Sequence, residues 1–302
     1  MNPRSVTFVE VGPRDGLQNE LTPFSTAQKL EFITRAIACG IRRIEVASFV
    51  NPARVPQMAD AEAVLEALPE REDVSYIGLA LNRRGVERAL HTKVHEVGAV
   101  CAATDGFARA NQGQTSQESL ELAMEIVRAA RAGGKTGQIT LSVAFGCPFE
   151  GEVAPARVLE MCRRAAESRP MEIALADTIG VAVPAQAGDL VAAVREAIAP
   201  TPVRAHFHNT RNTAIANVWA AVQAGASVVD GSIGGLGGCP FAPKSTGNVP
   251  SEDVAYLLAR SGVETGLELD RLIACAGWLS SVLDRPLPGM VSRAGNFPRA
   301  SA

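Results

Sequence analysis

The feature that most constrains the fold of this chain is a regular alternation of short apolar segments with amphipathic segments. Eight short segments have the apolar, β-branched composition of strands, and a segment with helical periodicity follows each of them. Most of the strand segments are almost continuously apolar, which is typical of a parallel sheet covered by helices on both faces. The expected strands are 5–11, 42–47, 74–81, 96–102, 139–145, 172–176, 203–208 and 227–232, and the expected helices are 25–39, 58–68, 83–91, 116–132, 155–168, 184–198, 212–224 and 251–261.

Eight strand–helix units in one chain of 302 residues predict an α/β fold, a closed (β/α)8 or TIM barrel. A doubly wound open sheet is the alternative, but its usual GxGxxG fingerprint does not follow the first strand. We expect residues 1–262 to form the barrel as a catalytic domain. Residues 263–302 are expected to form a short C-terminal extension, a helix over 267–284 and a tail, packed on the barrel.

Charge and cysteine usage exclude several classes of protein. The chain has 29 basic and 32 acidic residues, so it lacks the basic excess expected of a nucleic-acid-binding or membrane-surface protein. No apolar run approaches the roughly 18 residues of a membrane-spanning helix, and the N-terminus lacks the apolar core of a signal peptide. The six cysteines form no CxxC pair. We therefore expect reduced thiols and a cytoplasmic location.

Polar side chains gather where the predicted strands end. In a TIM barrel the loops after the strands form the active site, so residues at these positions are candidates for chemistry. The two sharpest are His206 and His208, which lie two apart on the seventh strand and therefore point to the same face, roughly 6.6 Å apart along it. The other candidates are Arg14 and Asp15 after the first strand, Glu45 within the second, Asp177 after the sixth, and Asn248 after the eighth.

An HxH pair at the end of a barrel strand favours metal ligation, although a single buried histidine is more often a core residue. Asp15 is the candidate third ligand, and its alternative is a plain β-turn in Pro13–Gly16. Asn248 either adds its amide oxygen to the metal or caps the last barrel helix. Imidazole and oxygen ligands without a thiolate favour Mg²⁺ or Mn²⁺ over zinc.

Two acidic residues also have a functional and a structural interpretation. Glu45 interrupts an apolar strand, and a buried carboxylate is costly unless it is paired, for which Arg14 is the expected partner. The alternative is an outward Glu45 that forms a salt bridge to a helix. Asp177 is interpreted as a group near the metal that supports the ligands or acts as an acid or base, or alternatively as the cap of a turn.

A glycine-rich loop follows the eighth predicted strand and carries one thiol. Residues 231–240 contain five glycines and end with Cys239-Pro240. The loop lacks the second glycine of a phosphate-binding P-loop, so that interpretation is rejected. A flexible loop of this kind is expected to bring Cys239 over the substrate.

In these segments the chain resembles the 3-hydroxy-3-methylglutaryl-CoA (HMG-CoA) lyases of the DRE-TIM metallolyase group. The matching stretches are VEVGPRDGLQNE, IEVASFV, ADTIGVA, HFHNT and GLGGCPFAPKSTGNVPSEDV, and they are distributed along nearly the whole barrel. The resemblance implies the metal ligands Asp15, His206, His208 and Asn248. It also implies the catalytic residues Arg14, Glu45, Asp177 and Cys239.

The resemblance further implies a homodimer that uses a divalent cation, Mg²⁺ or Mn²⁺, and an acyl-CoA substrate. The implied reaction is a retro-Claisen cleavage of HMG-CoA to acetyl-CoA and acetoacetate. The chain departs from the family at Asn209, Arg211 and Leu21, where an acidic residue, an aromatic residue and a lysine are usual. These departures leave a related 3-hydroxyacyl-CoA open as the substrate, and Arg211 is a candidate for binding a second carboxylate or a CoA phosphate. A Claisen-type synthase is disfavoured because only a short segment follows the barrel.

Overall fold

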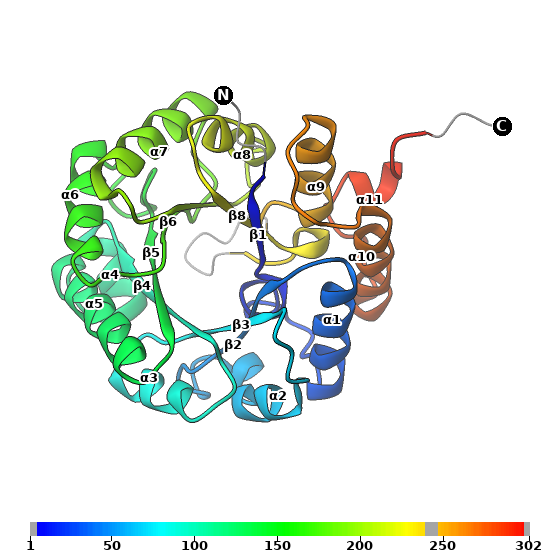
Figure 1. Ribbon diagram of the computed structural model, residues 1–302, viewed down its shortest axis with the longest axis horizontal. Helices are drawn as coiled ribbons and strands as arrows, with labels where there is room; N and C mark the ends of the chain where they lie inside the picture. Colours follow the sequence, from blue (N-terminus) through cyan, green and yellow to red (C-terminus); the bar gives the residue numbers. More distant parts are fainter. Residues whose placement is uncertain (1–4, 239–246, 299–302) are drawn as a thin grey trace.

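The computed structural model describes residues 5–238 and 247–298, and these residues form a closed barrel of eight parallel strands. Each strand pairs with its neighbours in chain order, and β1 pairs with β8 to close the sheet (Figure 1). The predicted TIM barrel is therefore confirmed. The strands are β1 Thr7–Glu10, β2 Arg43–Ser48, β3 Ser75–Leu79, β4 Glu96–Ala102, β5 Thr136–Ser142, β6 Ile173–Asp177, β7 Val203–Phe207 and β8 Val228–Gly231.

The helices surround the barrel and begin close to their predicted residues. The predicted capping box is present, because Ser25 Oγ accepts a hydrogen bond from Gln28 N and Gln28 Oε1 accepts one from Ser25 N. The outer helices are α1 Thr26–Ala38, α2 Ala61–Ala67, α3 Arg83–Leu90, α5 Ser116–Ala132, α6 Pro155–Ala166, α7 Pro184–Ile198, α8 Ala214–Gln223 and α9 Ser251–Arg260.

Three local features differ from the expectations. The fifth strand begins and ends three residues earlier than the predicted 139–145, because Val143 has a positive φ of 52° and leaves the extended conformation. A helix that we did not predict, α4 (Asp105–Gln112), lies between β4 and α5. The segment after β1 is a π-helical turn, η1 (Gly12–Gly16), in place of the β-turn considered for Pro13–Gly16.

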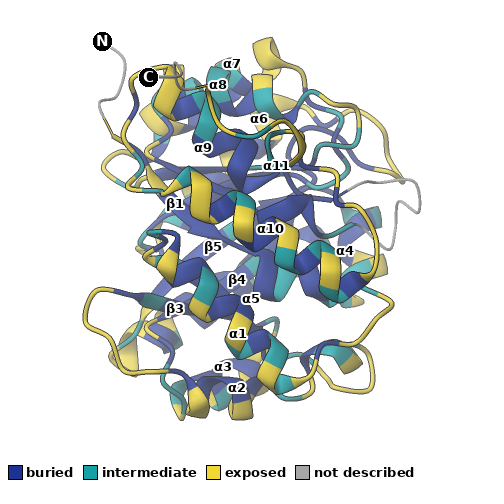
Figure 2. Cartoon of the chain, turned by 90° about the vertical axis from the view of Figure 1, so that its right-hand side faces the viewer, coloured by how far each residue is buried: buried dark blue, intermediate teal, exposed yellow. Residues whose placement is uncertain are grey.

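The main hydrophobic core lies between the strands and the surrounding helices, where buried side chains form one continuous cluster. Figure 2 shows the buried strands at the centre and the exposed helix faces outside. Inside the barrel the aliphatic residues are few: Val9, Val11, Ile77 and Val228 form a small separate cluster. Charged and polar side chains fill much of the remaining interior, although bulky aliphatic residues are usual there.

Two further helices follow the barrel, α10 (Leu269–Leu283) and α11 (Val291–Ala294). α10 packs against α1 and α9, and its apolar residues Leu272, Leu279 and Leu283 join the main core. The division of the chain into a barrel domain, residues 1–262, and a C-terminal extension, residues 263–302, therefore stays a prediction. Among the described residues, every helix is too short or too polar to cross a membrane.

Candidate active site

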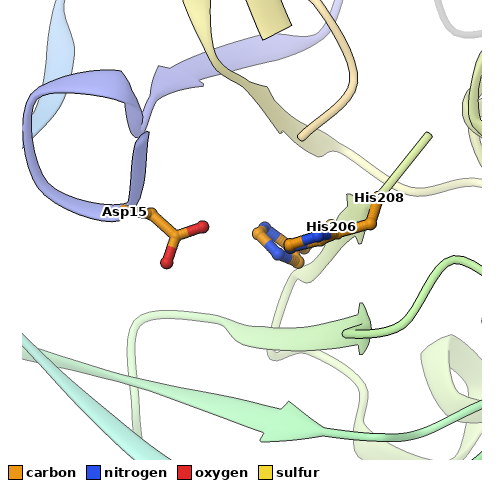
Figure 3. Close-up of side chains that lie close together, drawn as sticks. All are labelled: Asp15, His206 and His208. Atoms are coloured by element: carbon orange, nitrogen blue, oxygen red, sulfur yellow. The ribbon is translucent and has the colours of Figure 1, made fainter. Parts of the chain in front are cut away.

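Three potential metal ligands converge at the C-terminal mouth of the barrel. One ligand atom each from Asp15, His206 and His208 lies within 4.8 Å of the others. Asp15 comes from η1, whereas the two histidines come from the end of β7 on the other side of the mouth, and the three side chains point toward one another (Figure 3). The imidazole ring centroids are 5.1 Å apart. The sequence-predicted HxH pair and Asp15 are thus brought together.

The tight turn that presents Asp15 is fixed by the backbone. The Val11 carbonyl oxygen accepts hydrogen bonds from the N–H groups of Arg14, Asp15 and Gly16 at 3.2, 2.7 and 3.2 Å. Gly12 N donates to Glu10 Oε1 at 2.9 Å, and a Cβ at Gly12 would lie 2.5 Å from that oxygen. This position therefore requires glycine, and the turn holds Asp15 in place.

His206 is oriented by Asp230, a residue that sequence reasoning missed. His206 Nδ1 lies 2.9 Å from Asp230 Oδ1, and Asp230 is buried on β8. A proton on Nδ1 leaves the Nε2 lone pair for a cation, which is the usual arrangement of a metal-binding histidine. Burial alone would lower the pKa of His206, but the carboxylates of Asp230 and Asp15 raise it overall.

Asn248 contributes an oxygen that lacks a partner. Its Nδ2 donates to Asp15 Oδ2 at 2.9 Å and to the Leu236 carbonyl oxygen at 3.1 Å. Its Oδ1 is buried and accepts no hydrogen bond from any described residue, and a buried acceptor left in this way is costly unless a cation or water satisfies it. The alternative role as a helix cap is wrong, because Pro250 occupies the N-cap of α9 and no side chain caps that helix.

This set of donors fits a hard divalent cation. Two imidazoles, one carboxylate and one amide oxygen would leave open positions for substrate oxygens. Burial alone would raise the pKa of Asp15, but Arg14, the two histidines and the Asn248 hydrogen bond lower it well below its usual range. The carboxylate is therefore ionised and suited to ligation.

Arg14 and Glu45 form the ion pair expected from the sequence. Arg14 Nε and Nη2 donate to Glu45 Oε2 at 2.9 and 2.6 Å, and Arg14 Nη1 donates to Asp15 Oδ1 at 2.7 Å. Glu45 thus points into the barrel, which excludes the alternative of an outward salt bridge. The two carboxylates raise the pKa of Arg14 against the opposing effect of its burial, so the guanidinium stays charged.

Asp15, His206, His208 and the Arg14–Glu45 ion pair line one cavity of about 150 Å³, which also includes Arg204 and Asp230 in its walls. Asn248 lies behind Asp15, to which it donates a hydrogen bond, and does not itself line the cavity. Asp177 does not line it. Its two oxygens accept hydrogen bonds from the N–H groups of Val181 and Ala182 at 2.9 and 3.0 Å. Burial raises the pKa of Asp177. This geometry corresponds to the turn-capping interpretation and gives no support to an acid or base role beside the metal.

Two other residues singled out in the sequence, Arg211 and Cys147, lie outside the cavity. Arg211 donates to the carbonyl oxygens of Ile179 and Gly180 at 3.2 and 2.8 Å and does not line the cavity, so it holds the loop after β6. Cys147, which we could not assign from sequence, is buried and accepts a hydrogen bond from Thr104 Oγ1 at 3.0 Å. Cys239 lies outside the described residues.

A chain of buried ion pairs continues from the metal site toward the bottom of the barrel. Asp230 Oδ2 accepts from Arg204 Nε at 2.5 Å, and Arg204 Nη1 lies 3.3 Å from Glu172 Oε1. Glu172 also pairs with Arg43, which binds Glu96. Arg204 was missed although it lies two residues before His206 and therefore on the same inward face.

A larger cleft adjoins the cavity. It has a volume of about 700 Å³ and shares Gln18, Asn19 and Asn111 with the cavity walls. The cavity alone has space for a small acid, whereas the cleft has the size usual for sites of larger ligands. The mouth of the barrel therefore offers a small reactive end and an open extension from it.

Comparisons with known proteins place the chain in a family of lyases. The sequence profile of the HMGL-like family matches residues 5–278. The chain is 43% identical to a (R)-citramalyl-CoA lyase of Chloroflexus aurantiacus, over 96% of this chain and 95% of that protein.

Solved structures of HMG-CoA lyases superpose closely on the chain. The enzyme of Bacillus subtilis is 37% identical with a TM-score of 0.93, covering 97% of this chain and 98% of that one. The enzyme of Acinetobacter baumannii, solved in complex with coenzyme A and 3-methylmalate, is 35% identical with a TM-score of 0.93, covering 99% and 98%. The chain therefore belongs to the HMGL-like family and is a carbon–carbon lyase that acts on CoA esters.

Proposed function

We propose that this lyase cleaves HMG-CoA to acetyl-CoA and acetoacetate by a retro-Claisen reaction that depends on a divalent cation. The observation that carries the proposal is the cation site itself. It combines Asp15, His206 and His208 with a charged Arg14 in one cavity, and Asn248, whose Oδ1 has no partner among the described residues, is hydrogen-bonded to Asp15. Mg²⁺ and Mn²⁺ are the cations that best suit these ligands.

A bound cation would supply Lewis acidity to the tertiary hydroxyl and a neighbouring oxygen of the substrate. Arg14 donates hydrogen bonds to the thioester oxygen, where negative charge develops as the C2–C3 bond breaks. Its guanidinium is held against Glu45 by two hydrogen bonds, so it is oriented before the substrate arrives. Preorganised donors of this kind typically contribute about 10²–10³ in rate each.

The reaction also moves two protons. The C3 hydroxyl loses one, and the acetyl-CoA enolate gains one. Asp177 is committed to two backbone N–H groups outside the cavity, so we assign the first transfer to a group at the cation site. We assign the second to Cys239, because a thiol with a pKa of about 8.5 is mostly protonated at neutral pH.

Citramalyl-CoA is the second candidate substrate, favoured by the 43% identity with a citramalyl-CoA lyase. It has the same tertiary 3-hydroxyl and 3-methyl groups as HMG-CoA, but its carboxylate arm is one methylene shorter. Cleavage would then give acetyl-CoA and pyruvate. The same residues serve both reactions, with the acyl group in the small cavity and the CoA arm in the adjoining 700 Å³ cleft.

The test is product analysis with each substrate in turn. Purified protein is treated with chelator and then assayed with HMG-CoA or citramalyl-CoA, with and without added Mg²⁺ or Mn²⁺. We expect acetyl-CoA and one keto acid, formed only with the cation. Acid formed by plain thioester hydrolysis, or turnover that persists without the cation, would contradict the proposal. A homodimer and a cytoplasmic location remain predictions.

A further inference from the structure

Arg204 places a second cationic group in the cavity, and the cation site does not explain its presence there. Arg204 lies on β7 two residues before His206, on the same inward face. Only 4% of its surface is exposed, yet it lines the 150 Å³ cavity together with Asp15, His206 and His208.

The guanidinium of Arg204 is fixed through two of its three nitrogens. Nε donates to Asp230 Oδ2 at 2.5 Å, and Nη1 donates to Gln138 Oε1 at 2.8 Å and to Glu172 Oε1 at 3.3 Å. Nη2 has no acceptor among residues 5–238 and 247–298. It is also not one of the fully buried polar atoms that lack a partner, so it is accessible from the cavity.

Arg14 differs in that each of its three nitrogens already has an acceptor, Glu45 or Asp15, although Nη1 and Nη2 each keep a second N–H for the thioester oxygen. In Arg204 the whole of Nη2 is left without an acceptor among the described residues. Arg204 therefore offers the cavity a fixed, charged donor that a ligand can use, and a hydrogen bond from such a charged group is among the stronger ones in proteins.

We propose that Arg204 Nη2 binds the carboxylate on the acyl group of the substrate, and that this contact makes the enzyme selective for acidic 3-hydroxyacyl-CoAs. The inference rests on the proposed function. The cavity already contains the carboxylates of Asp15, Glu45 and Asp230, which repel an entering anion unless it meets a cation. Its volume of about 150 Å³ is small beside the adjoining cleft of about 700 Å³, so the short acyl end of the substrate is the part that suits it.

The test compares acidic and neutral ligands in wild type and in Arg204→Lys. The acidic ligands are HMG-CoA and citramalyl-CoA, and the neutral one is 3-hydroxy-3-methylbutanoyl-CoA, which has the same tertiary alcohol without the carboxylate. The lysine retains a positive charge for Asp230 but loses the planar second donor. Dissociation constants are measured by calorimetry on chelator-treated protein, which is not expected to turn over, and kcat and KM are measured with Mg²⁺ wherever turnover occurs.

Arg43→Lys is the matched control. Arg43 belongs to the same ion network, but its nitrogens donate to Glu96 and Glu172 and it does not line the cavity. It carries the same chemical change without removing a donor from the site. Thermal unfolding of both variants reports any loss of structure.

We expect wild type to bind the acidic ligands at least 10-fold more tightly than the neutral one. Arg204→Lys should lower the affinity for the acidic ligands about 10- to 100-fold and leave the affinity for the neutral ligand unchanged. In the kinetic assay, the rise in KM should be larger than the fall in kcat. Arg43→Lys should preserve the wild-type selectivity. The inference is overturned if wild type binds the acidic and neutral ligands with equal affinity. It is also overturned if Arg204→Lys lowers the affinity for all three ligands by the same factor. If wild type binds the acidic ligands selectively but cleaves neither HMG-CoA nor citramalyl-CoA, the proposed function is wrong while the inference about Arg204 stands.

Discussion

Replacing Asp230 with asparagine should weaken cation binding by imposing the wrong tautomer on His206. Asp230 is 1% exposed, and its two oxygens face different partners, His206 Nδ1 at 2.9 Å and Arg204 Nε at 2.5 Å. Arginine has no acceptor, so the asparagine oxygen must turn toward Arg204. The amide NH₂ then faces His206 Nδ1, which has to accept a hydrogen bond and leave its proton on Nε2.

A proton on Nε2 occupies the lone pair that would hold the cation. Loss of an outer hydrogen-bond partner of a metal-binding histidine typically costs 10- to 100-fold in affinity, about 1.4–2.7 kcal/mol. We therefore expect Asp230→Asn to raise the Kd for Mn²⁺ by at least this factor. Titration followed by the electron paramagnetic resonance of free Mn²⁺ measures the change directly.

Glu172→Gln is the control for this experiment. Glu172 belongs to the same buried network, since it pairs with Arg43 and Arg204, but it touches none of the proposed ligands. The two variants should lose similar thermal stability, whereas only Asp230→Asn should lose Mn²⁺ affinity. The reasoning about the tautomer is refuted if Asp230→Asn titrates like wild type, or if Glu172→Gln weakens Mn²⁺ binding as much.

Three further changes test other parts of the molecule. Arg14→Gln should lower kcat by about 10²–10³ while the Mn²⁺ titration stays close to wild type, and full activity would remove Arg14 from the mechanism. His208→Ala should weaken Mn²⁺ binding, and an unchanged titration would exclude it as a ligand. Burial raises the pKa of Glu10 from 4.5 to about 8, so its contribution to stability is greatest below pH 4.5 and is lost as the pH rises toward 8. Glu10→Gln should therefore flatten the fall in Tm between pH 5 and 8, and parallel curves would contradict this.

The sequence predicted the features that depend on local pattern. Alternating apolar and helical segments indicate eight units, and the barrel then brings the end of β7 and the loop after β1 to the same mouth. The grouping of His206, His208 and Asp15 could therefore be predicted from the sequence. The π-helical turn could not be predicted, because it depends on the Val11 carbonyl oxygen accepting hydrogen bonds from three N–H groups.

Asp230 was missed although the sequence carried a signal for it. The argument used for Glu45, that a carboxylate in an apolar strand needs a partner, applies equally to Asp230 after Val228 and Val229. Asp177 shows the opposite difficulty. It ends β6, and only the structure shows that its neighbours Ala176 and Thr178 face the cavity while its own carboxylate holds the next loop.

The balance of charge inside the barrel gives an independent reason for a divalent cation. The described barrel interior contains three guanidinium groups and five carboxylates in two neighbouring groups of ion pairs: Arg14 with Asp15 and Glu45 at the mouth, and Arg43 and Arg204 with Glu96, Glu172 and Asp230 below them. With neutral histidines as ligands, two negative charges are left over, and uncompensated charge in a buried site is costly. A doubly charged cation at the histidine end of the network cancels that excess. The acidic network and the cation site thus account for each other, and the substrate carboxylate then adds the single negative charge that the remaining donor of Arg204 is placed to receive.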